Sequence, residues 1–341
     1  MRVMIAAAVS PFSGREEMHW AQAIVKGLSV KKVEVDLFML PIVHNPLLLP
    51  EQMTALRLMT VENSSDLLIT IGYPAFVLKH ARKRVLLFSL APSLHENFDS
   101  EYGILSTPQY HRIRGAVLDA EKKCLSEAEW ITCASKSLAE ILKADYNLKA
   151  NTLILDDVFE DGGMGQSLEK GTWVVCESTL EPSERIDLLL SAVAISQVKW
   201  KLNIFVPSAS DVYRQALQHR IERMALTDRV IVTETPLRMD VLKESCVYIA
   251  LHINTLRIPE SALRSVKLRI PIITASDCGA LLEITTHEIN GLVVEPSAKN
   301  IAQALDKVVI DKKLKQRLSQ RTQPSGCVLS SVESVIEGLM G

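Results

Sequence analysis

Short apolar runs alternate with amphipathic stretches along most of this 341-residue chain. The apolar runs suit buried strands, and the stretches between them, such as Met18–Leu28 and Arg112–Ser126, suit helices. Such alternation is typical of parallel sheets with helices on both faces, so the predicted fold class is α/β. The predicted strands are Val3–Val9, Val33–Leu40, Leu67–Ile71, Val85–Leu90, Trp130–Ala134, Trp173–Glu177, Leu202–Val206, Val230–Thr233, Tyr248–Leu251 and Ile270–Thr274.

The two series of strands are separated by residues 156–171, which read DDVFEDGGMGQSLEKG. Glycines and acidic residues in this density are typical of a linker between domains. The sequence therefore predicts one Rossmann-like domain over residues 1–155 and a second over residues 172–322, each long enough to bury its own core.

Composition excludes several classes of function. The net charge of −2 gives no electrostatic reason to expect nucleic-acid binding. No apolar run reaches the roughly 18 residues that a membrane-spanning helix needs, and the opening MRVMIAAAVSPF fits a first buried strand better than a signal segment. The six cysteines form no C-x-x-C pair or zinc spacing. We expect a cytoplasmic protein with no metal and no cofactor.

Three stretches carry a resemblance to a known family. Residues 247–296 combine a buried strand, a polar loop, a helix, the strand Ile270–Thr274 and an Asp-x-Gly turn closing on Glu283, and residues 65–90 and 128–142 add a matching first half. This pattern resembles the GT-B glycosyltransferases of family 4. The resemblance implies two tandem doubly wound domains facing a cleft, the first on the acceptor side and the second on the donor side. It also implies that the C-terminal helix, over residues 323–341, crosses back to the first domain.

The family's charged donor-binding residues are replaced in this chain. Counted back from Pro271, the places of the family's two glutamates hold Leu256 and Arg264. In ESTLEPSERIDLLLSA, the arginine and lysine that clamp the donor diphosphate are replaced by Thr179 and Glu184. A carboxylate 4 Å from a phosphate costs on the order of 4 kcal/mol at a surface-like dielectric. We interpret Glu184 and the adjacent Arg185 as a solvated helix end, with Arg185 pointing elsewhere.

In the N-terminal half of the chain, some positions keep the residues of the family pattern. Gly14 remains from the family's glycine pair after strand one, and Arg15 beside it could compensate with positive charge. The family's acceptor-side histidine is absent from the loop after Val85–Leu90, and His95 is the nearest candidate for a catalytic role. A lone loop histidine of this kind is usually exposed to solvent.

In the second half, Asp277, Gly279 and Glu283 remain from the turn beside the donor phosphates. Glu260 is the other catalytic candidate, although its position favours a carboxylate that stabilises a helix N-terminus.

Because the histidine loop, the arginine and lysine clamp and the paired glutamates have all changed, the leading hypothesis is a pseudo-glycosyltransferase of glycan or glycoconjugate biosynthesis. The resemblance implies a catalytic glycosyltransferase subunit as a partner, or a glycan or glycoprotein acceptor as a ligand. The alternative is an active retaining enzyme that binds a nucleotide sugar in a rebuilt pocket. Its positive charge would come from Arg15, Arg257, Arg264 and Lys267, with Glu260 in the sugar site. A third possibility, a purely structural interaction module, would be marked by an exposed apolar patch.

Overall fold

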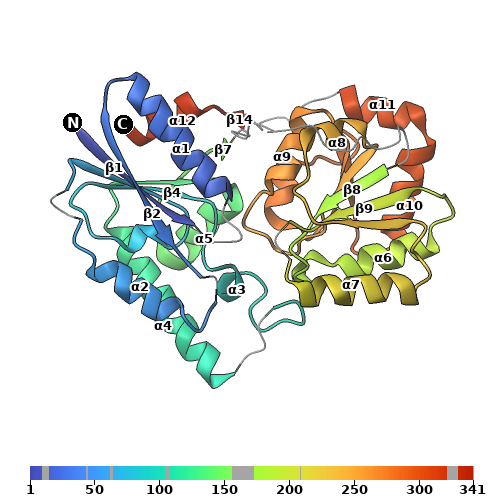
Figure 1. The fold of residues 1–341 in the computed structure, drawn as a ribbon, viewed down its shortest axis with the longest axis horizontal. Helices are drawn as coiled ribbons and strands as arrows, with labels where there is room; N and C mark the ends of the chain where they lie inside the picture. The colour runs from blue at the N-terminus through green and yellow to red at the C-terminus, as the bar shows by residue number, and fades with distance from the viewer. Residues whose placement is uncertain are drawn as a thin grey trace. The chain divides into compact units, whose positions relative to one another are not determined.

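The computed structural model describes residues 1–9, 15–43, 45–61, 64–103, 107–155, 173–207, 209–320 and 329–340. The chain divides into two compact units (Figure 1). Unit 1 comprises Met1–Phe159 with Val328–Gly341, and unit 2 comprises Glu160–Cys327. Each unit contains a six-stranded sheet in which the recorded strand pairs are parallel, so the predicted fold class is confirmed. The expected linker over residues 156–171 lies outside the described residues.

Unit 1 has the strand order β2-β1-β3-β4-β5-β6. The chain moves outward from β1 to β2 on one side, and then from β3 to β6 on the other. The strands are β1 (Arg2–Val9), β2 (Glu34–Pro41), β3 (Leu67–Ile71), β4 (Lys83–Leu87), β5 (Trp130–Cys133) and β6 (Asn151–Thr152). The helices are α1 (Arg15–Val30), α2 (Leu49–Leu58), η1 (Ala75–Val77), α3 (Pro92–His95), α4 (Pro108–Ser126) and α5 (Lys136–Tyr146). Ser135 caps α5, since its side chain accepts a hydrogen bond from the Leu138 amide.

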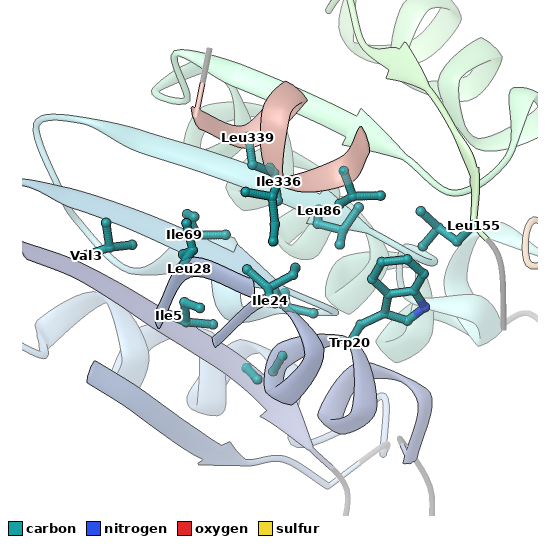
Figure 2. Packing of buried hydrophobic residues seen from close by; sticks show 14 of the residues in the cluster. Val3, Ile5, Trp20, Ile24, Leu28, Ile69, Leu86, Leu155, Ile336 and Leu339 are labelled. Atoms are coloured by element: carbon teal, nitrogen blue, oxygen red, sulfur yellow. The ribbon is translucent and has the colours of Figure 1, made fainter. Parts of the chain in front are cut away.

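The last helix, α12 (Val332–Met340), belongs to unit 1 and lies beside α1 (Figure 1). Figure 2 shows Ile336 and Leu339 of α12 in one apolar cluster with Ile24 and Leu28 of α1 and with side chains from β1, β3 and β4. A Cβ on Gly27 would lie 2.3 Å from Ile336 Cδ1, so this glycine permits the close approach of the two helices. The strand β14 (Leu329–Ser330), just before α12, pairs with β7 (Ile154–Leu155).

Unit 2 repeats the doubly wound pattern with the order β10-β9-β8-β11-β12-β13. Its strands are β8 (Trp173–Glu177), β9 (Lys201–Phe205), β10 (Val230–Thr233), β11 (Val247–Ile249), β12 (Ile272–Ala275) and β13 (Gly291–Val294). Its helices are η2 (Pro182–Glu184), α6 (Ile186–Ile195), α7 (Asp211–Arg223), α8 (Met239–Glu244), α9 (Glu260–Lys267), η3 (Gly279–Glu283), α10 (Ala298–Ile310) and α11 (Lys312–Gln320). Figure 1 shows α6 and α7 on one side of this sheet and α8 and α9 on the other.

The predicted strands all exist, with ends displaced by a few residues. The largest displacement is at β4, which spans Lys83–Leu87 rather than Val85–Leu90. The strands β6, β7, β13 and β14 were not predicted, since each is only two to four residues long.

Among the described residues, no helix combines the length and hydropathy that crossing a bilayer requires. The five cysteines in the described part of the chain are free and buried. Burial raises the pKa of Cys133 to about 12 and that of Cys246 to about 11, so these thiols are protonated at neutral pH and behave as small apolar groups.

Candidate functional site

The strand order of unit 2 identifies the part of its sheet where a ligand would bind. The chain runs from β8 outward to β10, and then returns to start again at β11 on the other side of β8. Open α/β sheets bind ligands beyond the carboxyl ends of the two strands at such a switch point. The residues that follow β8 and β11 are therefore the first place to look for a site.

A buried carboxylate occupies this position. Glu184, at the end of η2, is 6% exposed and accepts hydrogen bonds from Ser178, Thr179 and Leu180, the residues that follow β8. The Thr179 amide lies 2.8 Å from Oε2, the Leu180 amide 3.0 Å from Oε2, and the Thr179 hydroxyl 2.9 Å from Oε1. The Nε2 atom of His252, just after β11, lies 3.1 Å from Oε1. We call Ser178, Thr179, Leu180, Glu184 and His252 the Glu184 cluster.

The Glu184 cluster stabilises the charged form of its carboxylate. Burial by itself would raise the pKa of Glu184, but His252, the Ser178 hydroxyl and the Thr179 amide outweigh it and hold the pKa below its ordinary value. The donors are the Thr179 and Leu180 amides, the Ser178 and Thr179 hydroxyls and the His252 imidazole. Together they suit one oxyanion. In this chain the anion that they bind is part of the protein.

The interpretation of Glu184 and Arg185 as a solvated helix end is therefore wrong. Both residues are buried, at 6% and 5% exposed. The backbone explains why: Arg185 has φ 52°, which turns the chain sharply between η2 and α6 and directs both side chains inward. A left-handed residue at this point is not visible in the residue types.

Arg185 joins the Glu184 cluster to the next strand along. Its guanidinium donates to Asp277 Oδ1 at 2.6 Å, and Asp277 follows β12. The loop after β11 is bound to the same turn, since the Asn254 amide donates to the Asp277 carbonyl at 2.8 Å. Gly279 has φ +49°, and a Cβ there would lie 2.3 Å from the Thr255 carbonyl oxygen. The carboxyl ends of β8, β11 and β12 thus form one connected set of loops.

The remaining candidate residues of unit 2 lie in or near α9 and η3. Arg264 is 4% exposed, and its guanidinium donates to Glu260 at 2.7 Å and to the Leu237 carbonyl at 3.0 Å. Glu260 is the first residue of α9, where its carboxylate also suits the helix dipole. Leu256 is 5% exposed and contributes to the apolar core, whereas Glu283 is half-buried at the end of η3. Arg264 and Glu260 therefore neutralise one another in the part of the structure described.

In unit 1, two acidic side chains lie at the equivalent switch point, between β1 and β3. Glu16 and Glu17, in the first turn of α1, are each 6% exposed. A Cβ on Gly72, which follows β3 with φ +75°, would lie 2.6 Å from Glu17 Cγ. Gly14 and the side chain of Arg15 lie outside the described residues. Both switch points of the chain thus carry buried carboxylates.

His95 is not an exposed loop residue, contrary to the expectation. It ends α3, its side chain is 2% exposed, and its Nε2 atom lies 2.7 Å from Glu121 Oε2. Tyr146, from the last turn of α5, donates to the same carboxylate. Burial and the Glu121 charge raise the pKa of Tyr146 and of Tyr73, so both phenols stay neutral. These contacts join α3, α4 and α5 and place His95 inside the unit.

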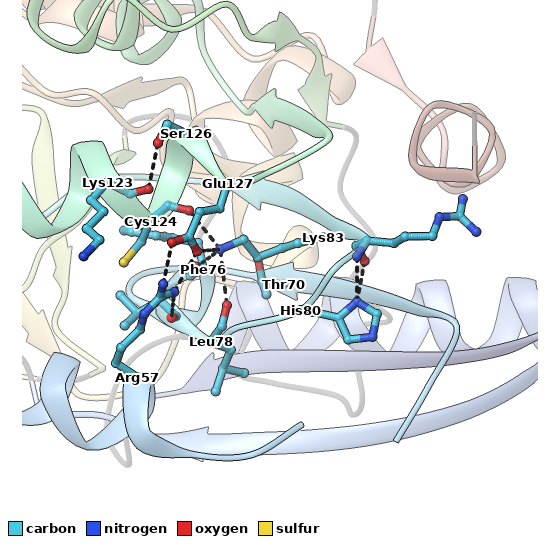
Figure 3. A network of polar contacts seen from close by, with 12 residues as sticks. Arg57, Thr70, Phe76, Leu78, His80, Lys83, Lys123, Cys124, Ser126 and Glu127 are labelled. Atoms are coloured by element: carbon cyan, nitrogen blue, oxygen red, sulfur yellow. Dashed lines mark hydrogen bonds and ion pairs between the residues drawn. The ribbon is translucent and has the colours of Figure 1, made fainter. Parts of the chain in front are cut away.

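A second buried ionic network lies at the opposite end of the unit 1 sheet. Figure 3 shows the Lys83 ammonium pointing toward Cys124, Phe76 and Leu78, whose carbonyl oxygens lie 2.8, 2.8 and 3.2 Å from Nζ. Glu127 lies 3.4 Å away and is also bound by Arg57. Burial lowers the pKa of Lys83, while Glu127 opposes the shift. We call Lys83, Glu127, Arg57 and the three carbonyl groups the Lys83 network.

Sequence reasoning missed Ser178 and His252, the two side chains that complete the Glu184 cluster. The available signal was that each follows a buried strand directly, but only the strand order shows that these two strands are neighbours. In the described part of the chain, no three His, Cys, Asp or Glu side chains gather in a way that suits a metal ion.

Comparison with known proteins gives three results. The profile of the family described as "Glycosyl transferases group 1" matches residues 165–324, which lie within unit 2. None of the curated proteins matches the chain. Among solved structures, HepE from Anabaena, in complex with UDP and glucose, is similar with a TM-score of 0.70 at 11% identity, covering 100% of this chain and 98% of that one.

Two further structures agree. Sucrose-phosphate synthase from Thermosynechococcus elongatus has a TM-score of 0.69 at 14% identity, covering 100% of this chain and 94% of that one. A glycosyltransferase from Rickettsia africae has a TM-score of 0.62 at 12% identity, covering 99% and 93%. Identities this low support the fold alone. The chain therefore has the GT-B fold, and residues 165–324 of its second unit are similar to the glycosyl transferases group 1 family.

Proposed function

We propose that this chain is a pseudo-glycosyltransferase of glycan or glycoconjugate biosynthesis, which supports a catalytic glycosyltransferase subunit or binds an acceptor glycan. The single observation that carries this proposal is the Glu184 carboxylate. It lies at the switch point of unit 2, where the fold favours an anionic ligand. It already accepts hydrogen bonds from the amides of Thr179 and Leu180.

A donor diphosphate would meet an unfavourable environment there. It would have to displace Glu184 from its hydrogen bonds or approach a buried negative charge. A buried charge left without partners costs several kcal/mol, and the added repulsion raises this cost. The positive charges nearby are engaged as well, since Arg185 binds Asp277 and Arg264 binds Glu260. The proposed consequence is a donor site that is closed by the protein itself.

The experiment that tests the proposal is a thermal unfolding series. The purified protein is unfolded with millimolar UDP, GDP, ADP, TDP and the corresponding nucleotide sugars. A ligand at about 100 times its Kd stabilises a protein by about 2.7 kcal/mol, a shift of a few degrees. We expect no shift with any of these ligands. A selective shift with one nucleotide would contradict the proposal.

A matched pair of variants sharpens the test. Glu184→Ala removes the internal anion and leaves its donors unused, so we expect this variant to be less stable but to gain stabilisation from nucleoside diphosphates. Glu181→Gln removes a carboxylate from the same loop without opening the Glu184 cluster, and we expect it to respond as the unmodified protein does. Equal responses of the two variants would show that Glu184 does not close the site.

One observation favours the alternative of an active retaining glycosyltransferase. Asp277, the partner of Arg185, is about one third exposed (34%), so a phosphate could compete with it for the guanidinium. In that case a nucleotide sugar would be hydrolysed slowly without acceptor, and Arg185→Met would abolish both hydrolysis and the nucleotide-dependent thermal shift. Release of free sugar from a panel of nucleotide sugars distinguishes the two functions.

A further inference from the structure

Unit 1 carries a surface groove far along the sheet from its switch point, beside α5 and the edge strand β6. The cavity has a volume of about 750 Å³, within the range of small-molecule sites. We call it the α5 groove. The side chains that decide its chemistry are Trp130, Lys136, Lys143, Lys149, Asn151 and Thr152.

The α5 groove has an apolar part. Ala139 and Ala150, which line it, are small and half-buried. Trp130 begins β5 and keeps 43% of its surface exposed, which is unusual for so large an apolar side chain. An exposed indole beside small apolar side chains offers a surface on which one face of a ring can stack.

The charge of the groove is positive. Three lysines line it against two glutamates, and one of these, Glu129, is engaged by Arg82 and Arg84 at 3.5 and 3.7 Å. Lys143 and Lys149 are exposed, and no ion pair is recorded for either among the described residues. Their positive charge is therefore available to an anionic ligand.

The lysines are distributed rather than convergent. Lys136 and Lys143 are seven residues apart on α5, two turns or about 10 Å along the helix axis. A single phosphate carries its charge at one point, whereas the lysines of the groove come from the start and the end of α5 and from the segment that follows it. A chain of acidic sugars carries its charges at several separate places, so its acidic groups can meet Lys143 and Lys149 at the same time.

The neutral polar groups fit the same ligand. Asn151 and Thr152 form β6, which is the edge strand of the sheet. Their amide and hydroxyl groups both donate and accept hydrogen bonds, as sugar hydroxyls require. We propose that the α5 groove is a binding site for an anionic oligosaccharide, with a sugar ring on Trp130 and its acidic groups at Lys143 and Lys149. This inference is independent of the state of the donor site in unit 2.

Isothermal titration with an oligosaccharide of four galacturonic acid units tests the proposal, with maltotetraose as the neutral probe and UDP as the nucleotide probe. We expect the acidic oligosaccharide to bind and maltotetraose to bind at least tenfold more weakly. Any heat measured with UDP should be the same in variants that alter the groove. Raising the salt concentration from about 50 mM to about 500 mM should weaken binding several-fold, because the lysines are exposed. Absence of binding, or equal binding of maltotetraose, would overturn the proposal.

Charge-matched variants locate the site. Lys143→Glu with Lys149→Glu should weaken binding at least tenfold. Lys312→Glu with Lys313→Glu changes the net charge equally on exposed residues of α11 and should leave binding unchanged. Equal losses in the two variants would reveal nonspecific attraction and overturn the site.

The aromatic platform needs its own pair, since Trp130 is part of a strand. Trp130→Phe keeps a ring, whereas Trp130→Ala removes it. We expect the phenylalanine variant to retain most of the affinity and the alanine variant to bind at least fivefold more weakly. Circular dichroism checks that both variants are folded to the same extent. Equal affinity of both variants for the acidic probe would exclude stacking on this residue and overturn the proposed mode of binding.

Discussion

The Glu184 cluster and the Lys83 network both bury a charge, yet they lie at opposite ends of their parallel sheets. Lys83 begins β4, and its ammonium binds main-chain carbonyl groups of Phe76, Leu78 and Cys124. Glu184 lies beyond the carboxyl end of β8 and binds main-chain amides. Ligand sites of open α/β sheets lie at the carboxyl ends of the strands. The buried charge of Glu184 therefore lies where a ligand would bind, and the buried charge of Lys83 does not. We interpret the Lys83 network as purely structural and the Glu184 cluster as a modified ligand site.

The largest effect is expected from Lys83→Met. This change leaves three buried carbonyl groups without their donor, so we expect a loss of about 3–5 kcal/mol in the free energy of unfolding. Chemical denaturation measures it. Ligand binding by unit 2 should not change, and a change there would show that the Lys83 network is more than structural.

A smaller loss is expected from Glu184→Gln. The side chain keeps its size but loses its charge, and with it the charge-assisted hydrogen bonds from Ser178, Thr179 and His252, for a loss of about 2 kcal/mol. The measurement is again chemical denaturation at neutral pH. Stability equal to that of the unmodified protein would mean that the donors around Glu184 do not depend on its charge, and the contrast with Lys83 would then fail.

The smallest effect is expected from pH. The pKa of Glu184 lies below its ordinary value of 4.5 in the folded protein, so the unfolded chain takes up this proton first as the pH falls. Its contribution to stability is therefore complete above about pH 4.5 and is lost as the pH falls through the folded pKa. The stability difference between the unmodified protein and Glu184→Gln should shrink over this interval. A difference that stays constant down to acid unfolding would contradict the depressed pKa.

The sequence predicted the fold well because hydrophobic periodicity is a local property. The strand and helix series, the cap at Ser135 and the absence of charged family residues at Thr179 and Leu256 could all be found by inspecting one segment at a time. The resemblance to GT-B transferases used the same local patterns.

The site was harder to predict because its geometry is not local. His252 meets Glu184 only because β11 lies next to β8, across 68 residues of chain that hold two other strands. The left-handed backbone of Arg185 turns two charged side chains inward, although their sequence suits an exposed helix start. His95 was likewise expected at the surface, but Glu121 and Tyr146 enclose it from elements later in the chain.

The return of α12 to unit 1 has a consequence for synthesis of the chain. Unit 2 is continuous, whereas unit 1 needs both Met1–Phe159 and Val328–Gly341. Domains generally fold as the chain emerges from the ribosome, N-terminal first. Unit 2 can therefore finish folding while the core of unit 1, with the places of Ile336 and Leu339 still empty, waits for α12 to be translated. Most of unit 1 is synthesised before unit 2 but unit 1 is completed after it, so its unfilled apolar surface needs protection from aggregation until then.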